Sequence, residues 1–352
     1  MMETVNLDTA GFFADPLVAA RTAQRPVGYV GLDIPEDILA APPFHAAHLP
    51  WQRDRRTPWA DRWLEDSFAG WARCIVEDWA DGRYDFMESV VFTRGDDTSQ
   101  RLYYYLAELQ RQGRIGGPRP LIFDTARIRR PSSEKWTVAA VRRLASELGL
   151  DDEDLAAGID AADRRRRILL SIDADRSFAS PFYERVARAS LFIPAESLPR
   201  RSALANPGSA GQVLLAGSSP PDDGLHLAVD AAGWSVAGEA CDRNLLRLGS
   251  PLRAVSGDPA ERIGRQCAAN PVGPRSFHDR AADILASVEE RGAGAVVFWL
   301  YEEDEAIAWD VAACRRALEA RGIATLVLAR RRWDLSDDPQ DDIARFLGSL
   351  AA

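Results

Sequence analysis

Lysine is almost missing from this sequence. Lys135 is the only one among 352 residues, so arginine supplies nearly all the positive charge, and the formal net charge is −10. A P-loop needs a lysine before serine or threonine at the end of a glycine-rich turn, and this requirement excludes that nucleotide-binding motif. An acidic chain also offers no basic surface for a polyanion, so no nucleic-acid partner is expected.

Cysteine and long apolar runs are scarce as well. Four single cysteines, with no CxxC pair, predict neither a disulfide framework nor a zinc knuckle; they are Cys74, Cys241, Cys267 and Cys314. The motifs HExxH and GxSxG do not occur. No segment approaches the roughly 20 apolar residues of a membrane span, and the opening "MMETVNLDTAGFF" is not a secretory signal. We therefore expect a cytoplasmic protein with no membrane partner.

Short apolar runs alternate with longer helical patterns along most of the chain. This alternation is typical of parallel sheets covered by helices, and it predicts an α/β fold. The expected strands are 26–32, 89–93, 120–124, 212–217, 234–238, 294–300 and 324–329. The expected helices between them are 68–80, 99–112, 135–149, 222–232, 277–291, 306–321 and 338–350.

The stretch from 125 to 200 interrupts this rhythm, because it is helical and heavily charged. The segment "RRSALANPGSAGQ" (200–212) then has the composition of a linker. We expect two Rossmann-like or flavodoxin-like lobes with parallel sheets, with a helical insert in or after the first. The predicted ranges are 1–124 for the first lobe, 125–205 for insert and linker, and 206–352 for the second lobe.

Acidic turns follow two of the expected strands. Asp96 and Asp97 come after 89–93, and Glu302, Glu303 and Asp304 come after 294–300. Open parallel sheets bind ligands beyond the carboxyl ends of their strands, so both turns are expected to face one cleft between the lobes. Carboxylates brought together there bind a divalent cation, share a proton, or remain apart and solvated.

Structural roles compete with these functional ones. Asp97 is well placed to cap the helix that begins near Ser99. Arg94 could hold an anionic substrate, but an ordinary ion pair is favoured. His45 and His48 are spaced to share a helical face, where packing is favoured over metal binding. Tyr103, Tyr104 and Tyr105 point in different directions on one helix, so at most two reach the cleft.

The run Arg164–Arg167 lies beside an acidic segment. Four arginines could hold a phosphate, but a solvated face with surface ion pairs is favoured.

Several stretches resemble the 2-hydroxyacyl-CoA dehydratase and benzoyl-CoA reductase family. The first is "VGYVGLDIPEDILAAPPFHAAHLP" (27–50), in which Asp37 replaces the usual Glu, and the second is "ARCIVEDWADGRYDFMESVVFTRGDDTSQRLYYYL" (72–106). The others are the beginning of the second half, "QVLLAGSSPPDDGLHLAVDAAGWSVAGEACDRN" (212–244), and the stretch 265–334. The likeness follows the order of the chain and is weakest in the helical insert.

The resemblance implies two α/β lobes whose three cysteines hold a 4Fe–4S cluster in the crevice, and subunits that work in pairs. In this sequence the three cysteine positions fall on Ala69 (or Asp66 in a shifted register), Asp96 and Asp304. Cys74 lies five residues beyond Ala69 and is not a substitute. Clusters need soft thiolates, whereas carboxylates suit hard divalent cations. We therefore expect no cluster on this chain and keep a divalent metal as an alternative.

Three functions remain open. The first is a cluster-free subunit that serves a homologous cluster-bearing partner in an acyl-CoA dehydratase-type or reductase-type complex. The second is a stand-alone acid–base or metal-dependent enzyme for a small acyl substrate, with Asp96, Asp97 and Asp304 as its catalytic residues. The third is a two-lobed binding protein. A small acyl or acyl-CoA ligand fits the resemblance, although no basic group for CoA phosphates stands out.

Overall fold

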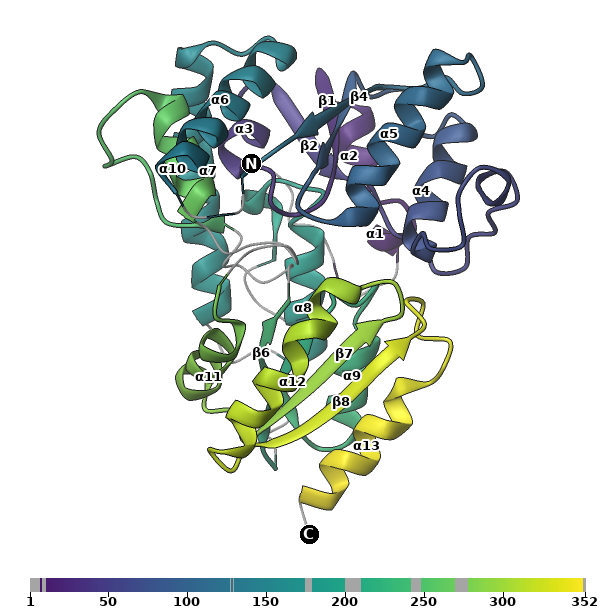
Figure 1. The fold of residues 1–352 in the computed structure, drawn as a ribbon, viewed down its shortest axis with the longest axis vertical. Coiled ribbons are helices and arrows are strands. Elements are labelled where there is room, and N and C mark those ends of the chain that lie inside the picture. Colours follow the sequence, from purple (N-terminus) through teal and green to yellow (C-terminus); the bar gives the residue numbers. More distant parts are fainter. Residues whose placement is uncertain are drawn as a thin grey trace.

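The computed structural model contains two lobes, each built on a four-stranded parallel sheet (Figure 1). The described residues are 7, 11–126, 128, 130–174, 179–199, 210–241, 248–269 and 278–350. The predicted α/β fold with two lobes is confirmed. The predicted linker at 200–212 lies almost entirely outside the described residues. No helix within the described ranges combines the length and the apolar character needed to cross a bilayer.

The first sheet has the order β2-β1-β3-β4. Its strands are β1 (Arg25–Val30), β2 (Phe44–His48), β3 (Ser89–Thr93) and β4 (Arg119–Phe123). The helices of this half are α1 (Gly11–Ala14), α2 (Val18–Arg21), α3 (Glu36–Leu39), α4 (Gly70–Ala80), α5 (Asp97–Arg111), α6 (Pro131–Leu148), α7 (Asp152–Ala174) and α8 (Ser180–Ala189).

The second sheet repeats this arrangement in the order β6-β5-β7-β8. Its strands are β5 (Gln212–Gly217), β6 (Ser235–Ala240), β7 (Ala295–Tyr301) and β8 (Ala324–Arg331). The helices are α9 (Gly224–Ala231), α10 (Pro259–Ala269), α11 (Arg280–Arg291), α12 (Glu305–Glu319) and α13 (Pro339–Leu350).

Both faces of each sheet are covered by helices, which explains the continuous apolar runs of the central strands. Successive side chains of a strand point to opposite faces, so in β3 Val90 and Phe92 join the core under α4 and α5, and Val91 joins the core under α6. In β7, Val297 packs toward α9 and α13, and Val296 packs toward α11 and α12.

The structure has a strand where the sequence predicted a helical face for two histidines. His45 and His48, predicted on a helix, lie in strand β2 at the edge of the first sheet. The ring of His45 hydrogen-bonds to the carbonyl oxygen of Phe192 (3.0 Å), and His48 is buried. This strand is short and carries alanine and histidine in place of the β-branched residues that mark a strand in a sequence.

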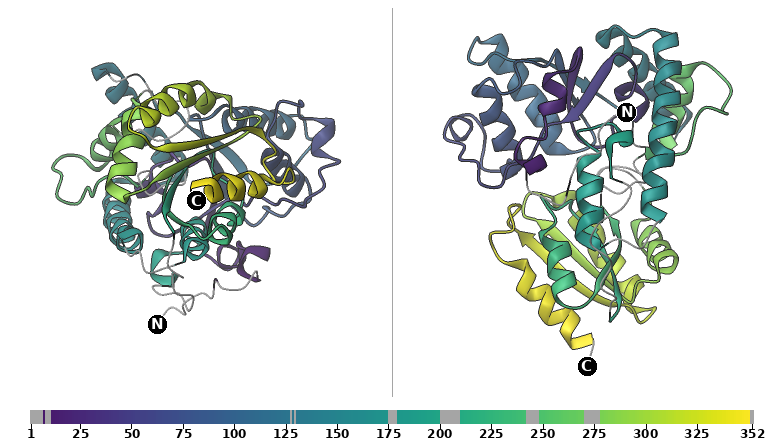
Figure 2. Two further views of the ribbon diagram at one scale, coloured as in Figure 1. Left: turned by 90° about the horizontal axis from the view of Figure 1, so that it is seen from below. Right: turned by 180° about the vertical axis from the view of Figure 1, so that it is seen from behind.

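The helical insert joins the two lobes. Helix α7 runs along the first lobe toward the second (Figure 2), and Asp173 near its end forms an ion pair with Arg291 of α11 (2.6 Å). Helix α10 belongs to the range 206–352, expected as the second lobe, yet it packs against α6 and α7. Its Ile263 lies in the core of the first lobe.

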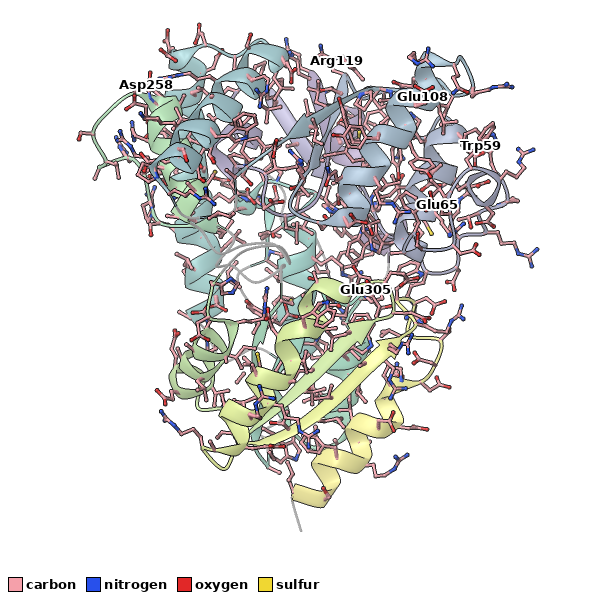
Figure 3. The ribbon with its side chains drawn as sticks, viewed as in Figure 1. Trp59, Glu65, Glu108, Arg119, Asp258 and Glu305 are labelled. Carbon is pink, nitrogen blue, oxygen red and sulfur yellow. The ribbon has the colours of Figure 1, made fainter. Side chains whose placement is uncertain are left out.

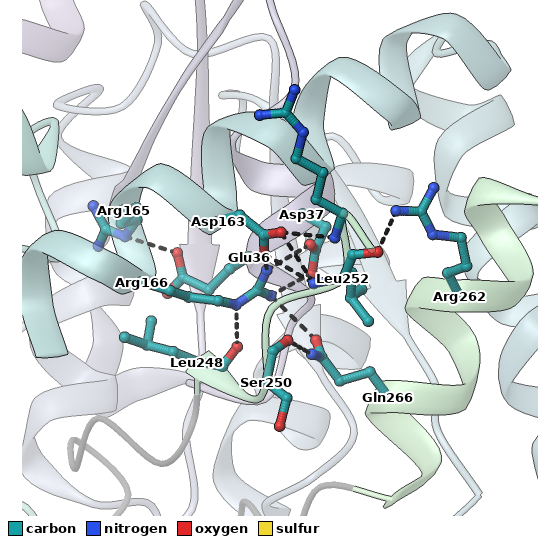
Figure 4. Close-up of polar contacts among 11 residues, drawn as sticks. Glu36, Asp37, Asp163, Arg165, Arg166, Leu248, Ser250, Leu252, Arg262 and Gln266 are labelled. Carbon is teal, nitrogen blue, oxygen red and sulfur yellow. Dashed lines mark hydrogen bonds and ion pairs between the residues drawn. The ribbon is translucent and has the colours of Figure 1, made fainter. Parts of the chain in front are cut away.

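A buried ion-pair network holds α10 and the residues before it on the first lobe (Figure 4). Arg166 binds Asp37 through two hydrogen bonds of 3.0 and 2.8 Å, and Asp163 through one of 2.6 Å. It also donates to the carbonyl oxygen of Leu248 (2.6 Å) and to Gln266 (3.1 Å). The expected solvated arginine face is therefore wrong for Arg166, which is 1% exposed.

Candidate functional site

A cavity of about 700 Å³ lies between the two lobes. The first lobe contributes the residues that follow β1 and β3, and the second lobe contributes those that follow β7 and begin α12. Figure 3 labels Glu305 at the start of α12, on the side of the second lobe that faces the first. The carboxyl ends of both sheets thus meet at one cleft, as expected for open parallel sheets.

Glycines with positive φ turn the chain at equivalent places in both lobes. Gly31 follows β1 with φ of +97°, and Gly217 ends β5 with φ of +101°. A Cβ atom on Gly31 would lie 2.0 Å from Cγ2 of Thr93, and one on Gly217 would lie 2.5 Å from the carbonyl oxygen of Trp299. Only glycine lets these two turns approach the neighbouring strands so closely.

Asp96 caps helix α5. Its Oδ1 accepts a hydrogen bond of 2.7 Å from the backbone amide of Ser99. Capping was expected of Asp97, but Asp97 is the first residue inside the helix, and its Oδ2 lies 3.5 Å from Nη1 of Arg101. The cap therefore lies one residue earlier than predicted, because Asp96 has the extended backbone conformation of an N-cap residue.

Asp304 occupies the corresponding position in the second lobe, directly before α12. Its Oδ2 accepts a hydrogen bond of 2.6 Å from the hydroxyl of Ser218, which follows β5. Burial raises the pKa of Asp304 to about 6; the Ser218 hydrogen bond opposes this rise, and the charge of Asp96 adds to it. The two carboxyl groups therefore interact across the cleft.

The predicted acidic residues Asp66, Glu302 and Glu303 lie on the same walls, and the structure adds Asp33 and Glu305. The first lobe contributes Asp33, Asp66, Asp96 and Asp97. The second contributes Glu302, Glu303, Asp304 and Glu305. Burial raises the pKa of Glu303, and the neighbouring Glu302 charge contributes to that rise. The catalytic roles of Asp96, Asp97 and Asp304 stay predictions, while their gathering on one cavity is a structural observation.

Several expected partners lie elsewhere. Arg94 forms an ion pair with Asp124 (2.6 Å). The side chain of Tyr105 donates to Glu65 (2.7 Å), and Tyr104 is exposed; none of the three consecutive tyrosines lines the cavity. Arg101 is the arginine of the lining, and it also binds Glu65 (2.8 Å).

Aromatic side chains form another part of the lining, which the sequence reasoning missed. Trp51 and Trp71 stack with ring centroids 5.1 Å apart and an interplanar angle of 19°. The buried imidazole of His48 packs edge-on against Trp51. Trp309 lies at the cavity with 85% of its surface exposed. Ser218 was missed too, although its position after a strand could have indicated it.

The described residues do not fit an iron–sulfur cluster. Ala69 is fully buried at the start of α4, and Asp66 is exposed, with Arg73 3.9 Å away. None of the four cysteines lines the cavity. Burial raises the pKa of Cys74 to about 12, and its thiol donates to the carbonyl oxygen of Gln52 (3.1 Å), outside the cavity.

A dedicated metal site is also not seen in the part of the chain that the structure describes. No three His, Cys, Asp or Glu side chains there are arranged to hold one ion. The carboxylates of the cleft are instead distributed over both walls.

Comparison with known protein families gives a match that covers most of the chain. The family model described as 2-hydroxyglutaryl-CoA dehydratase, D-component, matches residues 32–342. A search of curated proteins found no match. The matched range runs from the turn after β1 to α13 and includes both walls of the cleft. This chain therefore belongs to the 2-hydroxyglutaryl-CoA dehydratase D-component family.

Proposed function

We propose that this chain is a subunit of an acyl-CoA dehydratase-type or reductase-type complex that carries no iron–sulfur cluster of its own. A homologous cluster-bearing subunit would supply the electron transfer, and this chain would support that subunit's site. One observation carries the proposal: at two of the three positions that the resemblance assigns to cluster cysteines, carboxylates already have structural partners. Asp96 caps α5, and Asp304 accepts from Ser218.

The donor chemistry supports the same conclusion. Carboxylate oxygens are hard ligands, whereas iron–sulfur clusters are held by thiolates. The four thiols lie away from the cavity, with Cys74 and Cys314 buried in the cores. The family description names one component of a dehydratase, which supports the expectation of a partner subunit.

The test is purification of the full chain from its native host under anaerobic conditions, with mass spectrometry of co-eluting proteins and assays of iron and sulfide. We expect a cysteine-complete homologue to co-elute and the separated chain to contain no stoichiometric iron. A sharper test compares the cluster absorbance of the wild-type chain with that of the triple variant Ala69→Cys, Asp96→Cys, Asp304→Cys, both after reconstitution with iron and sulfide. Cluster absorbance in the wild-type chain would contradict the proposal.

A second candidate is favoured by the state of Asp304. A carboxyl group with a pKa of about 6 is suited to both donate and accept a proton near neutral pH. Asp96 provides a second carboxyl on the same cavity. Under this alternative the isolated chain would act on a small acyl substrate by acid–base chemistry. Turnover by the chain without a partner, lost in Asp304→Asn, would favour it over the accessory role.

A further inference from the structure

A second cavity, of about 210 Å³, lies outside the cleft, where strand β2 forms the edge of the first sheet. Its walls are β2, α3, α7 and the segment 190–196, which follows α8. Successive side chains of a strand point to opposite faces, yet Phe44, His45 and Ala46 all line this cavity. The cavity therefore extends along the open edge of β2, and we call it the edge cavity.

The edge of β2 presents one unused pair of backbone groups there. The amide of Leu49 donates to Tyr29 of β1, whereas the amide of His48 donates outward to Leu191, so backbone groups of alternate residues point to the open edge. Ala46 lies two residues before His48 and points the same way. Its amide and carbonyl groups have no hydrogen-bond partner within the described part of the chain. One half-buried residue thus offers the edge cavity both a donor and an acceptor.

Two charged side chains of the same cavity have no ion-pair partner. Arg164 of α7 and Glu196 of the short 3-10 helix η2 (Ala195–Ser197) are exposed, and neither forms an ion pair with any residue that the structure describes. The other two charges of the lining neutralise each other, because Nε of Arg165 lies 3.0 Å from Oε2 of Glu36 (Figure 4). The edge cavity therefore has one unmatched cation and one unmatched anion.

The remaining walls are an imidazole ring and apolar side chains. Nε2 of His45 donates to the carbonyl oxygen of Phe192 (3.0 Å), since a carbonyl oxygen only accepts, and burial lowers the pKa of His45. The ring is neutral near pH 7 and leaves the charge balance of the edge cavity unchanged. Leu39, Phe44 and Ile193 supply an apolar surface.

We infer that the edge cavity binds a free α-amino acid with an aliphatic side chain. Its carboxylate pairs with Arg164 and accepts from the Ala46 amide, and its ammonium group pairs with Glu196 and donates to the Ala46 carbonyl oxygen. These two backbone bonds are those of an antiparallel hydrogen-bonded pair, so the ligand extends the sheet by one residue.

The size and the position of the edge cavity agree with this ligand. A volume of about 210 Å³ equals the share of roughly seven water molecules in the liquid, at about 30 Å³ each, which is room for one amino acid and too little for an acyl-CoA. The edge cavity and the cleft have no lining residue in common. The inference is therefore independent of the proposed function.

The experiment is isothermal titration calorimetry on the full chain with leucine. Two analogues serve as controls: 4-methylpentanoate lacks the ammonium group, and 3-methylbutylamine lacks the carboxylate. We expect leucine to bind and each analogue to bind at least about tenfold more weakly, because each loses one charge pair and one backbone hydrogen bond. Absence of leucine binding would overturn the inference, and so would an analogue that binds as tightly as leucine.

Matched variants locate the binding. Arg164→Gln removes the unmatched cation, and Arg167→Gln makes the same change at an exposed position of α7 outside the edge cavity. Glu196→Gln removes the unmatched anion, with Glu290→Gln on the exposed face of α11 as its control. We expect the two cavity variants to weaken leucine binding about fivefold each and the two controls to leave it unchanged. Equal losses in a variant and its control would place leucine on the general surface and contradict the inference.

Discussion

The hydroxyl of Ser218 donates a hydrogen bond of 2.6 Å to Oδ2 of Asp304 and so ties the residue after β5 to the residue before α12. Both residues lie where strands of the second sheet end, at the cleft. This contact favours the ionised carboxylate, while burial and the charge of Asp96 favour the protonated acid. Burial is the stronger influence, and the carboxyl titrates within reach of neutral pH.

The raised pKa of Asp304 predicts a pH-dependent stability. Its ordinary pKa is 3.8 and its value in the folded protein is about 6. Below pH 3.8 the carboxyl group of Asp304 is protonated in both the folded and the unfolded protein, and the stability that its protonated form confers is fully present. As pH rises through about 6, the folded protein must ionise a buried acid, so the stability conferred by the protonated form disappears.

We therefore expect Asp304→Asn to melt at a higher temperature than wild type at about pH 7.5 and at a similar temperature at about pH 4. Thermal unfolding followed by circular dichroism measures both. Ser218→Ala removes the hydrogen bond that opposes the shift, so it should move the transition to higher pH. Parallel melting curves for wild type and Asp304→Asn across this range would contradict the prediction.

The capping role of Asp96 predicts a difference between two adjacent carboxylates. Replacing an N-cap aspartate by alanine costs about 1 kcal/mol of unfolding free energy, because the amide that it binds loses its acceptor. We expect this loss for Asp96→Ala. Asp97→Ala should change stability much less, since the Asp97 side chain is 60% exposed and its pair with Arg101 spans 3.5 Å. Urea unfolding of both variants decides which carboxylate is the cap.

The burial of Arg166 predicts that two adjacent arginines, Arg166 and Arg167, contribute unequally to the stability of the fold. Arg166→Met leaves the carboxylates of Asp37 and Asp163 buried without their cation, which costs about 3–5 kcal/mol when one partner of a buried ion pair is removed. Arg167 is exposed on the same helix, so Arg167→Met should change the unfolding free energy by less than about 0.5 kcal/mol. Denaturant titration compares the two, and equal losses would show that Arg166 is not the centre of the network.

The thiols should differ in reactivity. Burial raises the pKa of Cys74 to about 12 and that of Cys314 to about 11, whereas Cys241 and Cys267 are half-buried. Alkylation proceeds through the thiolate, so iodoacetamide should leave Cys74 and Cys314 unmodified in the native protein and modify all four after denaturation. Peptide mass mapping of the native and denatured samples measures this. Modification of Cys74 in the native sample would show that its thiol is accessible.

The sequence predicted the repeated strands and helices well, because their apolar runs are long and buried on both faces. All seven expected strands occur within two residues of the predicted ends. β2 was missed, since "FHAAH" is short, lies at a sheet edge and carries no strand-forming pattern. The position of α10 was missed for a different reason: its packing against α6 and α7 is a long-range contact that periodicity does not report.

The site was predictable where it follows strand ends and not elsewhere. Asp96 and Asp304 lie in the short turns that follow apolar strands, so the rule for open parallel sheets predicted that they would lie at one cleft. Trp51 and Trp71 reach the cavity from a loop and from α4, and no local pattern marks them as lining residues. Which of Asp96 and Asp97 is the cap depends on the residue at which α5 begins, and the sequence does not fix that residue.

The packing of α10 on the first lobe means that a helix from the second half of the sequence completes the core of the first lobe. The polypeptide leaves the first lobe after α8, forms β5 and β6, returns to complete the first core with α10, and goes back for β7 and β8. A cut between the halves would remove Ile263 and the Gln266 partner of Arg166 from the amino-terminal fragment. The two lobes are therefore interleaved along the chain, and a fragment that ends before β5 would lack part of its own core.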